Sequence, residues 1–229
     1  MTTYAASLGS FQHHAPDVVE SILSCPTVSK ILFPAILPTS ADSGIRLTSP
    51  NDFKISLVVK ELYAEGLVRI PLSGERGVKF ASTIYLFQDL VTPNTVSFVL
   101  TDDHFRKGFV QLDDLRMLFA EIVPIFRVEH GSVYDQETAH RPGKPKYFLG
   151  PNQKSYPLDL DWITYFGPEL VEFLGQGRFV ALHSCVSKYE LYGGIMIVLQ
   201  NEPFQEDNPV HRERQARAEI ELSLDKFVP

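Results

Sequence analysis

The chain has 229 residues, of which 44% are hydrophobic and 21% charged, a composition typical of a folded globular protein. Its formal net charge of −7 argues against direct nucleic acid binding, because that function needs a basic face. The apolar runs are only strand-length, which argues against a membrane span. The acidity suits a basic partner, although acidity can also serve solubility alone.

Residues 1–16 are polar and interrupted, which predicts a loose N-terminal leader. They contain no apolar stretch of the kind that directs secretion. We therefore expect a cytoplasmic protein in a reducing compartment, where Cys25 and Cys185 stay as buried thiols. The sequence leaves open whether the two cysteines pair instead.

The next segments give weaker signals. Residues 18–23 have a weak helical period, and Pro34 and Pro38 end it. Residues 49–67 fit a helix, with Asp52 as its cap and Gly66 at its end. The same segment also alternates like a strand over 53–62, and of the two we favour the helix.

Two strands and an amphipathic helix follow. The runs at 79–90 and 95–102 predict strands, because turn residues separate them. Apolar side chains recur at helical spacing over 108–126, which predicts a helix, and residues 127–135 predict another strand. From this helix and from the alternating run 192–200 we expect these core side chains: Leu112, Leu115, Leu118, Phe119, Ile195, Ile197 and Leu199.

The segment 138–157 is rich in Pro, Gly and Lys and has no acidic residue, which predicts a long loop. After it, Trp162 precedes a Tyr-Phe-Gly-Pro turn and a short helix over 168–174. We expect Trp162, Tyr165 and Phe166 to anchor that turn by packing rather than to line a ligand pocket. If they are partly exposed, they become candidate interface anchors.

The last elements are strands at 179–191 and 192–200 and a helix that begins after an Asn208 cap, with Pro209 at its first position. The glycines within "YGGIMIVL" predict a tight turn or bulge. This mixed order of elements predicts an α+β fold, with a largely antiparallel sheet and helices packed mainly on one face. We expect residues 17–229 to form a single domain.

No motif predicts a cofactor or a metal site. The sequence has no phosphate-binding glycine loop, no paired CxxC and no HExxH. His183 and Cys185 would face the same side of the predicted strand, so a Cys/His dyad is conceivable, but a buried Cys beside a hydrogen-bonded His is commoner. An enzyme with an unrecognised site near these two residues stays open, as does a non-catalytic structural or interaction protein.

The second half of the chain resembles a bacterial family. The segments that carry the resemblance are "GSVYD", a Pro-rich loop, "DWITYFGPELVEFLG", "YGGIMIVLQNEP" and "NPVHRERQARAEIELSL". Over roughly residues 95–227 their order is similar to that of immunity proteins of polymorphic toxin and type VI secretion systems, in particular the immunity protein 52 family. The resemblance implies an antitoxin without catalysis. Such a protein blocks a cognate toxin, typically one similar to restriction-endonuclease-fold nucleases, through a tight protein–protein complex.

We expect this protein to act as a monomer or homodimer. The densest acidic region is 102–137, and within it Asp113 and Asp114 fit a helix start, where the dipole favours negative charge. Our candidates for contact with a basic nuclease cleft are the acids at predicted strand ends, namely Asp102, Asp103, Asp135 and Glu137. A solvated rim without a partner is the plainer alternative.

Overall fold

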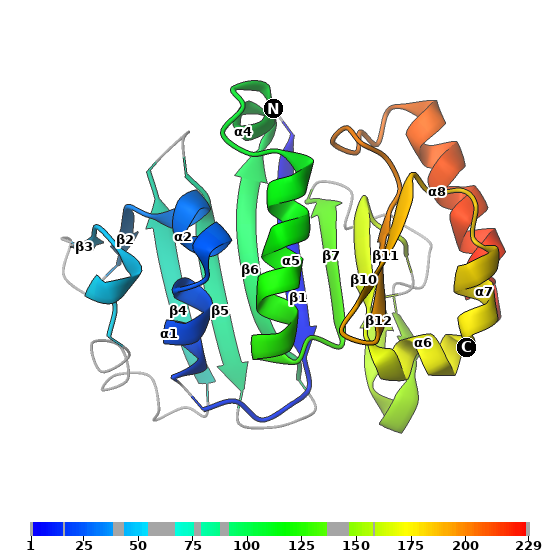
Figure 1. Cartoon of the computed structure of the whole chain (residues 1–229), viewed down its shortest axis with the longest axis horizontal. Helices are drawn as coiled ribbons and strands as arrows, with labels where there is room; N and C mark the ends of the chain where they lie inside the picture. Colours follow the sequence, from blue (N-terminus) through cyan, green and yellow to red (C-terminus); the bar gives the residue numbers. More distant parts are fainter. Residues whose placement is uncertain are drawn as a thin grey trace. The chain divides into compact units, whose positions relative to one another are not determined.

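A computed structural model describes residues 2–15, 17–38, 44–54, 67–75, 79–87, 92–136, 147–157 and 159–227. The predicted α+β class is confirmed, because antiparallel strands make up the sheet and helices pack against it (Figure 1). Contacts group the chain into two compact units, Thr3–Val128 and Glu129–Pro229, where the sequence analysis expected one domain over 17–229. We call them unit 1 and unit 2 and describe each by itself.

The sheet of unit 1 begins with the segment that the sequence analysis took for a loose leader. Residues Thr3–Ser10 form strand β1, with Tyr4, Ala6 and Leu8 buried, and pair antiparallel with β6. That part of the prediction is wrong, because small and hydroxylated residues between the apolar ones hide the alternation. From β1 onward the strands lie in the order β1 (Thr3–Ser10), β6 (Asn94–Thr101), β5 (Ala81–Phe87), β4 (Leu67–Gly74), β2 (Ala35–Leu37) and β3 (Ile45–Leu47).

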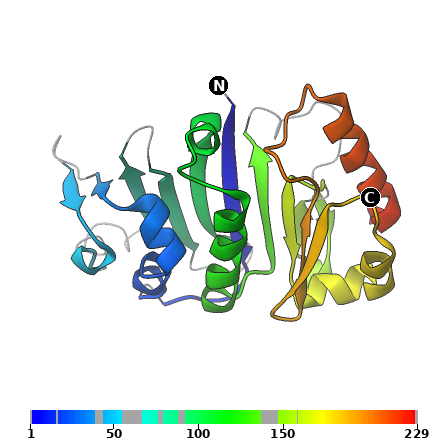
Figure 2. The ribbon, with the colours of Figure 1, turned by 45° about the horizontal axis from the view of Figure 1, so that its top comes forward.

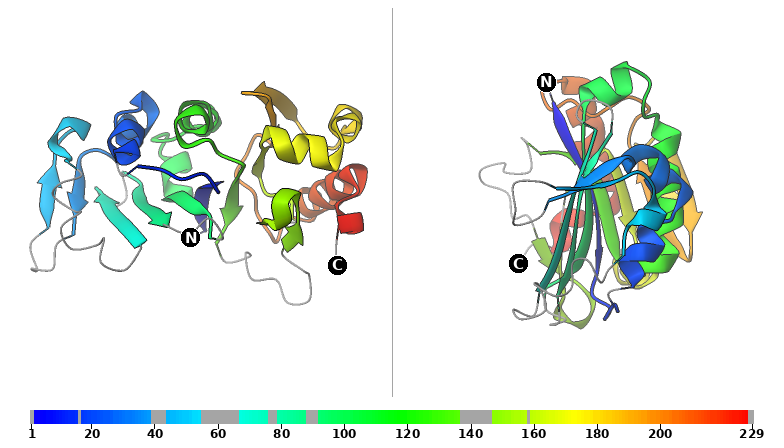
Figure 3. Two further views of the ribbon diagram at one scale, coloured as in Figure 1. Left: turned by 90° about the horizontal axis from the view of Figure 1, so that it is seen from below. Right: turned by 90° about the vertical axis from the view of Figure 1, so that its left-hand side faces the viewer.

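Three helices of unit 1 lie on one face of this sheet, as Figures 1 and 3 show: α1 (Val18–Leu23), α2 (Pro26–Leu32) and α5 (Leu112–Phe126). The amphipathic pattern placed α5 correctly, and Leu115, Leu118 and Phe119 are fully buried. Leu112 is only partly buried, because it occupies the first position of the helix. A short helix, α4 (Asp102–Arg106), follows β6 directly.

The ambiguous segment 49–67 is described only at its two ends. Pro50–Asp52 form a 3₁₀ turn, in which Asp52 accepts the backbone N–H of Ser49 at 2.9 Å. Asp52 therefore belongs to the capping box of this turn, whose N-cap is Ser49. The predicted helix over residues 55–66 lies outside the described residues.

Unit 2 contains four neighbouring strands in the order β11 (Ser187–Leu191), β12 (Gly194–Val198), β10 (Ile163–Phe166) and β7 (His130–Asp135). A separate antiparallel pair consists of β8 (Tyr147–Leu149) and β9 (Ser155–Pro157), joined by a 3₁₀ turn at Pro151–Gln153. Of the predicted core residues here, Ile197 and Leu199 are buried and Ile195 is partly buried.

The helices of unit 2 are α6 (Pro168–Leu174), α7 (Gln176–Ala181) and α8 (Pro209–Leu222), followed by a 3₁₀ turn at Leu224–Phe227 (Figure 2). The predicted bounds of α6 are confirmed, and the Asn208 side chain caps α8 by accepting the Val210 N–H at 3.0 Å. The strand predicted over 179–191 is wrong in its first half. There α7 restarts a helix after Gly175, whose φ of 95° ends α6.

A two-residue turn, Tyr192–Gly193, joins β11 to β12. Leu191 pairs with Gly194 across it, and Tyr192 and Gly193 have φ angles of 50° and 79°. Positive φ at both central residues is the signature of a type I′ hairpin turn. The predicted tight turn at these glycines is thus confirmed.

Candidate functional site

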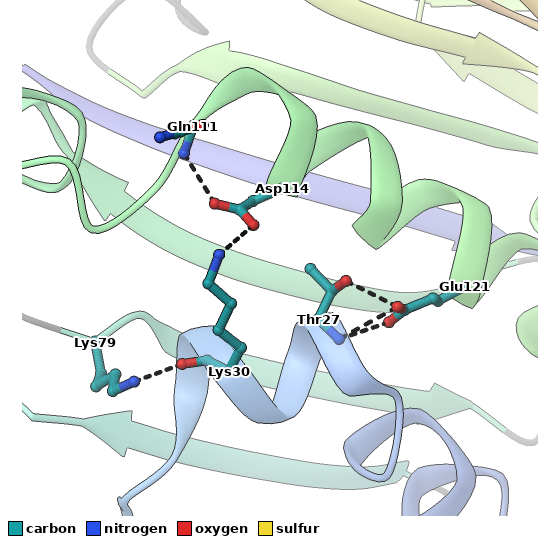
Figure 4. A network of polar contacts seen from close by, with 6 residues as sticks. All are labelled: Thr27, Lys30, Lys79, Gln111, Asp114 and Glu121. Carbon is teal, nitrogen blue, oxygen red and sulfur yellow. Dashed lines mark hydrogen bonds and ion pairs between the residues drawn. The ribbon is translucent and has the colours of Figure 1, made fainter.

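The acidic residues of α5 hold α2 in place. Glu121 accepts the Thr27 backbone N–H at 2.9 Å and the Thr27 hydroxyl at 2.8 Å, as Figure 4 shows. The residue before α2, Cys25, makes no side-chain capping bond. Glu121 therefore satisfies a donor at the start of α2 from another helix and places its negative charge at the positive end of the helix dipole.

Asp114 and Lys79 act at the other end of α2. Asp114 forms an ion pair with Lys30 at 2.5 Å, and its second oxygen accepts the Gln111 N–H at 3.0 Å, which caps α5 (Figure 4). The Lys79 ammonium donates to the Lys30 carbonyl near the end of α2. Glu121 and Asp114 both belong to the densest acidic region of the sequence. Their carboxylates are thus already engaged in contacts within unit 1.

Asp102 and Asp103 lie together at the start of α4. Asp102 accepts the hydroxyl of the buried Tyr4 at 3.0 Å. Asp103 forms ion pairs with Lys107, at 3.1 Å, and with Arg106. Lys107, and then Arg106, hold the pKa of Asp103 below its ordinary value. Both carboxylates keep some exposure, but neighbours in the same unit already compensate the charge of Asp103.

The other two candidate acids do not join them in one site. Asp135 ends β7 in unit 2, and only 6% of it is exposed. A residue buried to that degree is not part of a solvated rim, and it offers little surface for the predicted contact with a partner. Glu137 lies outside the described residues.

Another acid of this region, Glu129, is also engaged. It pairs with Lys154 at 2.9 Å and accepts the Tyr156 hydroxyl at 2.7 Å. Burial, helped by this bond to Glu129, raises the pKa of Tyr156. The contact ties β9 to the start of unit 2, so Lys154 of the predicted Lys-rich loop is a structural residue.

The aromatic candidates belong to the interior of unit 2. Trp162 is 1% exposed, and its indole N–H donates to the Gln200 carbonyl at 2.8 Å. Tyr165 and Phe166 lie on strand β10 rather than on a turn, because the strand ends only at Phe166 and α6 begins at Pro168. All three rings are buried, so they act as packing anchors and present nothing to a partner.

His183 and Cys185 lie in the connection between α7 and β11, so the strand alternation that placed them on one face does not apply. The backbone N–H groups of His183 and Ser184 donate to Glu221 of α8, at 2.7 and 3.0 Å. The His183 side chain is exposed, whereas Cys185 is half-buried, and burial raises the pKa of its thiol. Both cysteines are free thiols.

Unit 2 also buries polar groups that lack partners among the described residues. The Nε2 atom of His130 and both side-chain amide atoms of Gln200 have no hydrogen bond. Burial lowers the pKa of His130 to about 4, so the ring is neutral near neutral pH.

Within the described ranges, no three His, Cys, Asp or Glu side chains gather in an arrangement that could hold a metal ion. None of the described helices combines the length and the apolar character that a membrane crossing requires.

One exposed surface in unit 2 combines apolar and acidic side chains, and the sequence analysis did not single it out. We call it the α6–hairpin surface. It consists of Pro168, Glu169, Glu172 and Phe173 on the exposed side of α6, and Tyr192 at the tip of the β11–β12 hairpin. The two elements touch, since a Cβ placed on Gly193 would lie 3.4 Å from the Pro168 ring. The sequence does contain one signal for this surface, namely a bulky residue, Tyr192, directly before a glycine in a predicted tight turn.

This chain is similar to known proteins in structure but not in sequence. No protein-family model matches the chain, and no curated protein is significantly similar to it in sequence. In structure it is similar to the Pseudomonas aeruginosa T6SS protein PA0821, with a TM-score of 0.59 and 13% sequence identity. That similarity covers 98% of this chain and 84% of the other. At this identity it establishes a shared fold.

Proposed function

We propose that this chain is an immunity protein of a type VI secretion system, which binds a cognate toxin and neutralises it by forming a tight protein–protein complex. The observation that carries the proposal is the fold shared over 98% of the chain with a T6SS protein. The resemblance of residues 95–227 to immunity proteins, and to the immunity protein 52 family in particular, points in the same direction and rests on the sequence alone.

The proposed partner is a nuclease toxin with a basic cleft, and the proposed mechanism is occlusion of that cleft in the cytoplasm. A net charge of −7 supports this pairing, because opposite charges steer association and suppress wrong partners. Of the acids predicted to make contact, Asp102 and Asp103 remain candidates within unit 1. They already have contacts of their own, so a partner would have to compete for them.

The proposed mechanism contains no catalytic step by this chain. The variant Cys185→Ala is expected to keep full protection against the toxin, because the thiol would do no chemistry. Its stability should fall only modestly, since a small half-buried group is removed. Loss of protection with the fold intact would instead favour an enzyme with a site near His183 and Cys185.

The experiment that tests the proposal is co-expression with the product of the neighbouring open reading frame. We expect the two proteins to co-purify as a stoichiometric complex, and growth arrest by the neighbour to be relieved by this chain. A neighbour that is toxic, yet neither binds this chain nor is neutralised by it, would contradict the proposed function.

A further inference from the structure

The tip of the β11–β12 hairpin carries a residue that the turn itself does not favour. Tyr192 has a φ of 50°, in the left-handed region that suits Gly, Asn and Asp and disfavours bulky side chains. Its neighbour Gly193 meets the same requirement at no cost. The tyrosine is 61% exposed, so burial of its ring within the described unit does not offset the strain. Backbone strain that the fold does not offset is an indication of a functional position.

A second exposed aromatic ring lies further along α6. Phe173 of α6 is 42% exposed, while its inner side rests on Phe148 and Phe227, with ring centroids 6.3 and 5.5 Å away. A ring fixed on one side and open on the other loses little entropy on binding. Hot spots in protein interfaces are enriched in Trp, Tyr and Arg, and Phe is also enriched in interfaces.

The charged side chains that α6 exposes beside these rings are acidic. Glu169 and Glu172 are exposed, and neither has an ion pair among the described residues. Nearby bases of unit 2 are occupied, since Lys154 pairs with Glu129 and Lys188 donates to three carbonyls at the end of α7. This contrasts with α5, where Glu121 and Asp114 form hydrogen bonds and an ion pair with residues of α2.

We infer that the α6–hairpin surface is where unit 2 docks a basic protein surface, with Tyr192 and Phe173 as apolar anchors and the two carboxylates of α6 as the charge match. The inference rests on the proposed function, whose toxin would be that basic partner. It deepens that proposal by moving the principal contact from Asp102 and Asp103 to α6 and the hairpin.

The decisive variant is Tyr192→Asn, tested in the complex with the neighbouring gene product. Asparagine tolerates positive φ and is favoured in type I′ turns, so the variant should fold at least as stably as the parent. We nevertheless expect it to weaken binding about tenfold or more, as the loss of a hot-spot ring does. Ile220→Ala, which removes an equally exposed apolar side chain from α8, is the matched control and should leave the affinity unchanged.

The charge match is tested with the double variant Glu169→Gln/Glu172→Gln. We expect its association rate at low salt to fall several-fold and the salt dependence of that rate to flatten, because exposed charges act mainly on steering. The control Glu75→Gln/Asp207→Asn changes the net charge equally at exposed positions elsewhere and should have a smaller effect.

The outcomes separate this inference from the function on which it rests. If no complex forms with the unaltered chain, the proposed function fails first. If the complex forms and Tyr192→Asn binds as tightly as the parent, the docking site is wrong while the function stands. A third outcome is that the triple variant Arg141→Gln/Lys144→Gln/Lys146→Gln lowers the affinity while Tyr192→Asn and Glu169→Gln/Glu172→Gln do not. That result would point to an acidic partner and would also overturn the inference.

Discussion

The α2–α5 contact of unit 1 and the β7–β10–β12 strands of unit 2 differ in whether their polar side chains are hydrogen-bonded. Around α5, Glu121 and Asp114 are matched to donors from α2. Across the strands of unit 2, His130 and Gln200 are buried with side-chain atoms that have no partner among the described residues. A buried polar group contributes little when it is satisfied and costs a good deal when it is not. Removing a polar group should therefore lower the free energy of unfolding when the group lies in the first region and raise it when the group lies in the second.

The largest effect should come from pH acting on His130. The unfolded chain binds a proton there below about pH 6.5, whereas the folded chain does so only near a pKa of about 4. This contribution to the free energy of unfolding is fully present above pH 6.5 and is lost as the pH falls toward 4, by about 3 kcal/mol. The free energy of unfolding, measured by urea titration at several pH values across this range, should depend more steeply on pH in the parent than in His130→Phe. Parallel pH profiles would show that folding does not lower the pKa of His130.

Next in size should be Glu121→Ala, which tests the satisfied region. The change leaves the Thr27 N–H and hydroxyl without their acceptor and removes a charge from the start of α2. We expect the free energy of unfolding to fall by about 2 kcal/mol in urea titrations. Glu121→Gln keeps one acceptor oxygen and should lose about half as much. Equal losses for both variants would mean that packing, and not capping, sets the value of this residue.

A smaller change of opposite sign is expected from Gln200→Met. The side-chain amide has no hydrogen bond among the described residues, whereas the Gln200 carbonyl that accepts the Trp162 N–H is kept in the variant. Replacing an unsatisfied amide by an apolar group of similar length should raise the free energy of unfolding by about 1 kcal/mol. A decrease would break the comparison, because it would reveal a partner or a buried water at this amide.

The smallest effect should be that of Glu172→Gln on stability. This carboxylate is exposed and has no ion pair among the described residues, so the unfolding free energy should stay within about 0.5 kcal/mol of the parent. Against the loss expected for Glu121→Ala, this would show that equal charges on α5 and α6 serve different purposes. A loss above about 1 kcal/mol would assign Glu172 a structural role.

The sequence was sufficient for elements whose own pattern decides their structure. The apolar period of α5, the cap at Asn208 and the bounds of α6 follow from local spacing and local chemistry, and all were predicted. Strand β1 was missed because small and hydroxylated residues separate its buried Tyr4, Ala6 and Leu8, and because its pairing with β6 is distant in sequence. Helix α7 was missed because three of its terminal carbonyls are satisfied by Lys188, a residue of the next strand.

The candidate site was harder to predict for the same reason. Acid density in the sequence pointed to residues 102–137, but whether a carboxylate is free depends on partners brought by folding, such as Thr27 for Glu121. Burial of Asp135 and of Trp162 likewise depends on neighbouring strands. The strained position of Tyr192 requires a backbone angle, which only the folded hairpin defines.

The pairing of β1 with β6 has a consequence for how the chain is made. Thr3 pairs with Thr101 and Ser10 with Asn94, so β1 is synthesised well before the strand with which it pairs. Contacts of such long sequence separation form slowly, because the loop between them must close first. Until then, Tyr4, Ala6 and Leu8 remain exposed as an unpaired strand, open to chaperones and to aggregation. Slow synthesis of the segment between β1 and β6 should therefore lower the yield of folded protein.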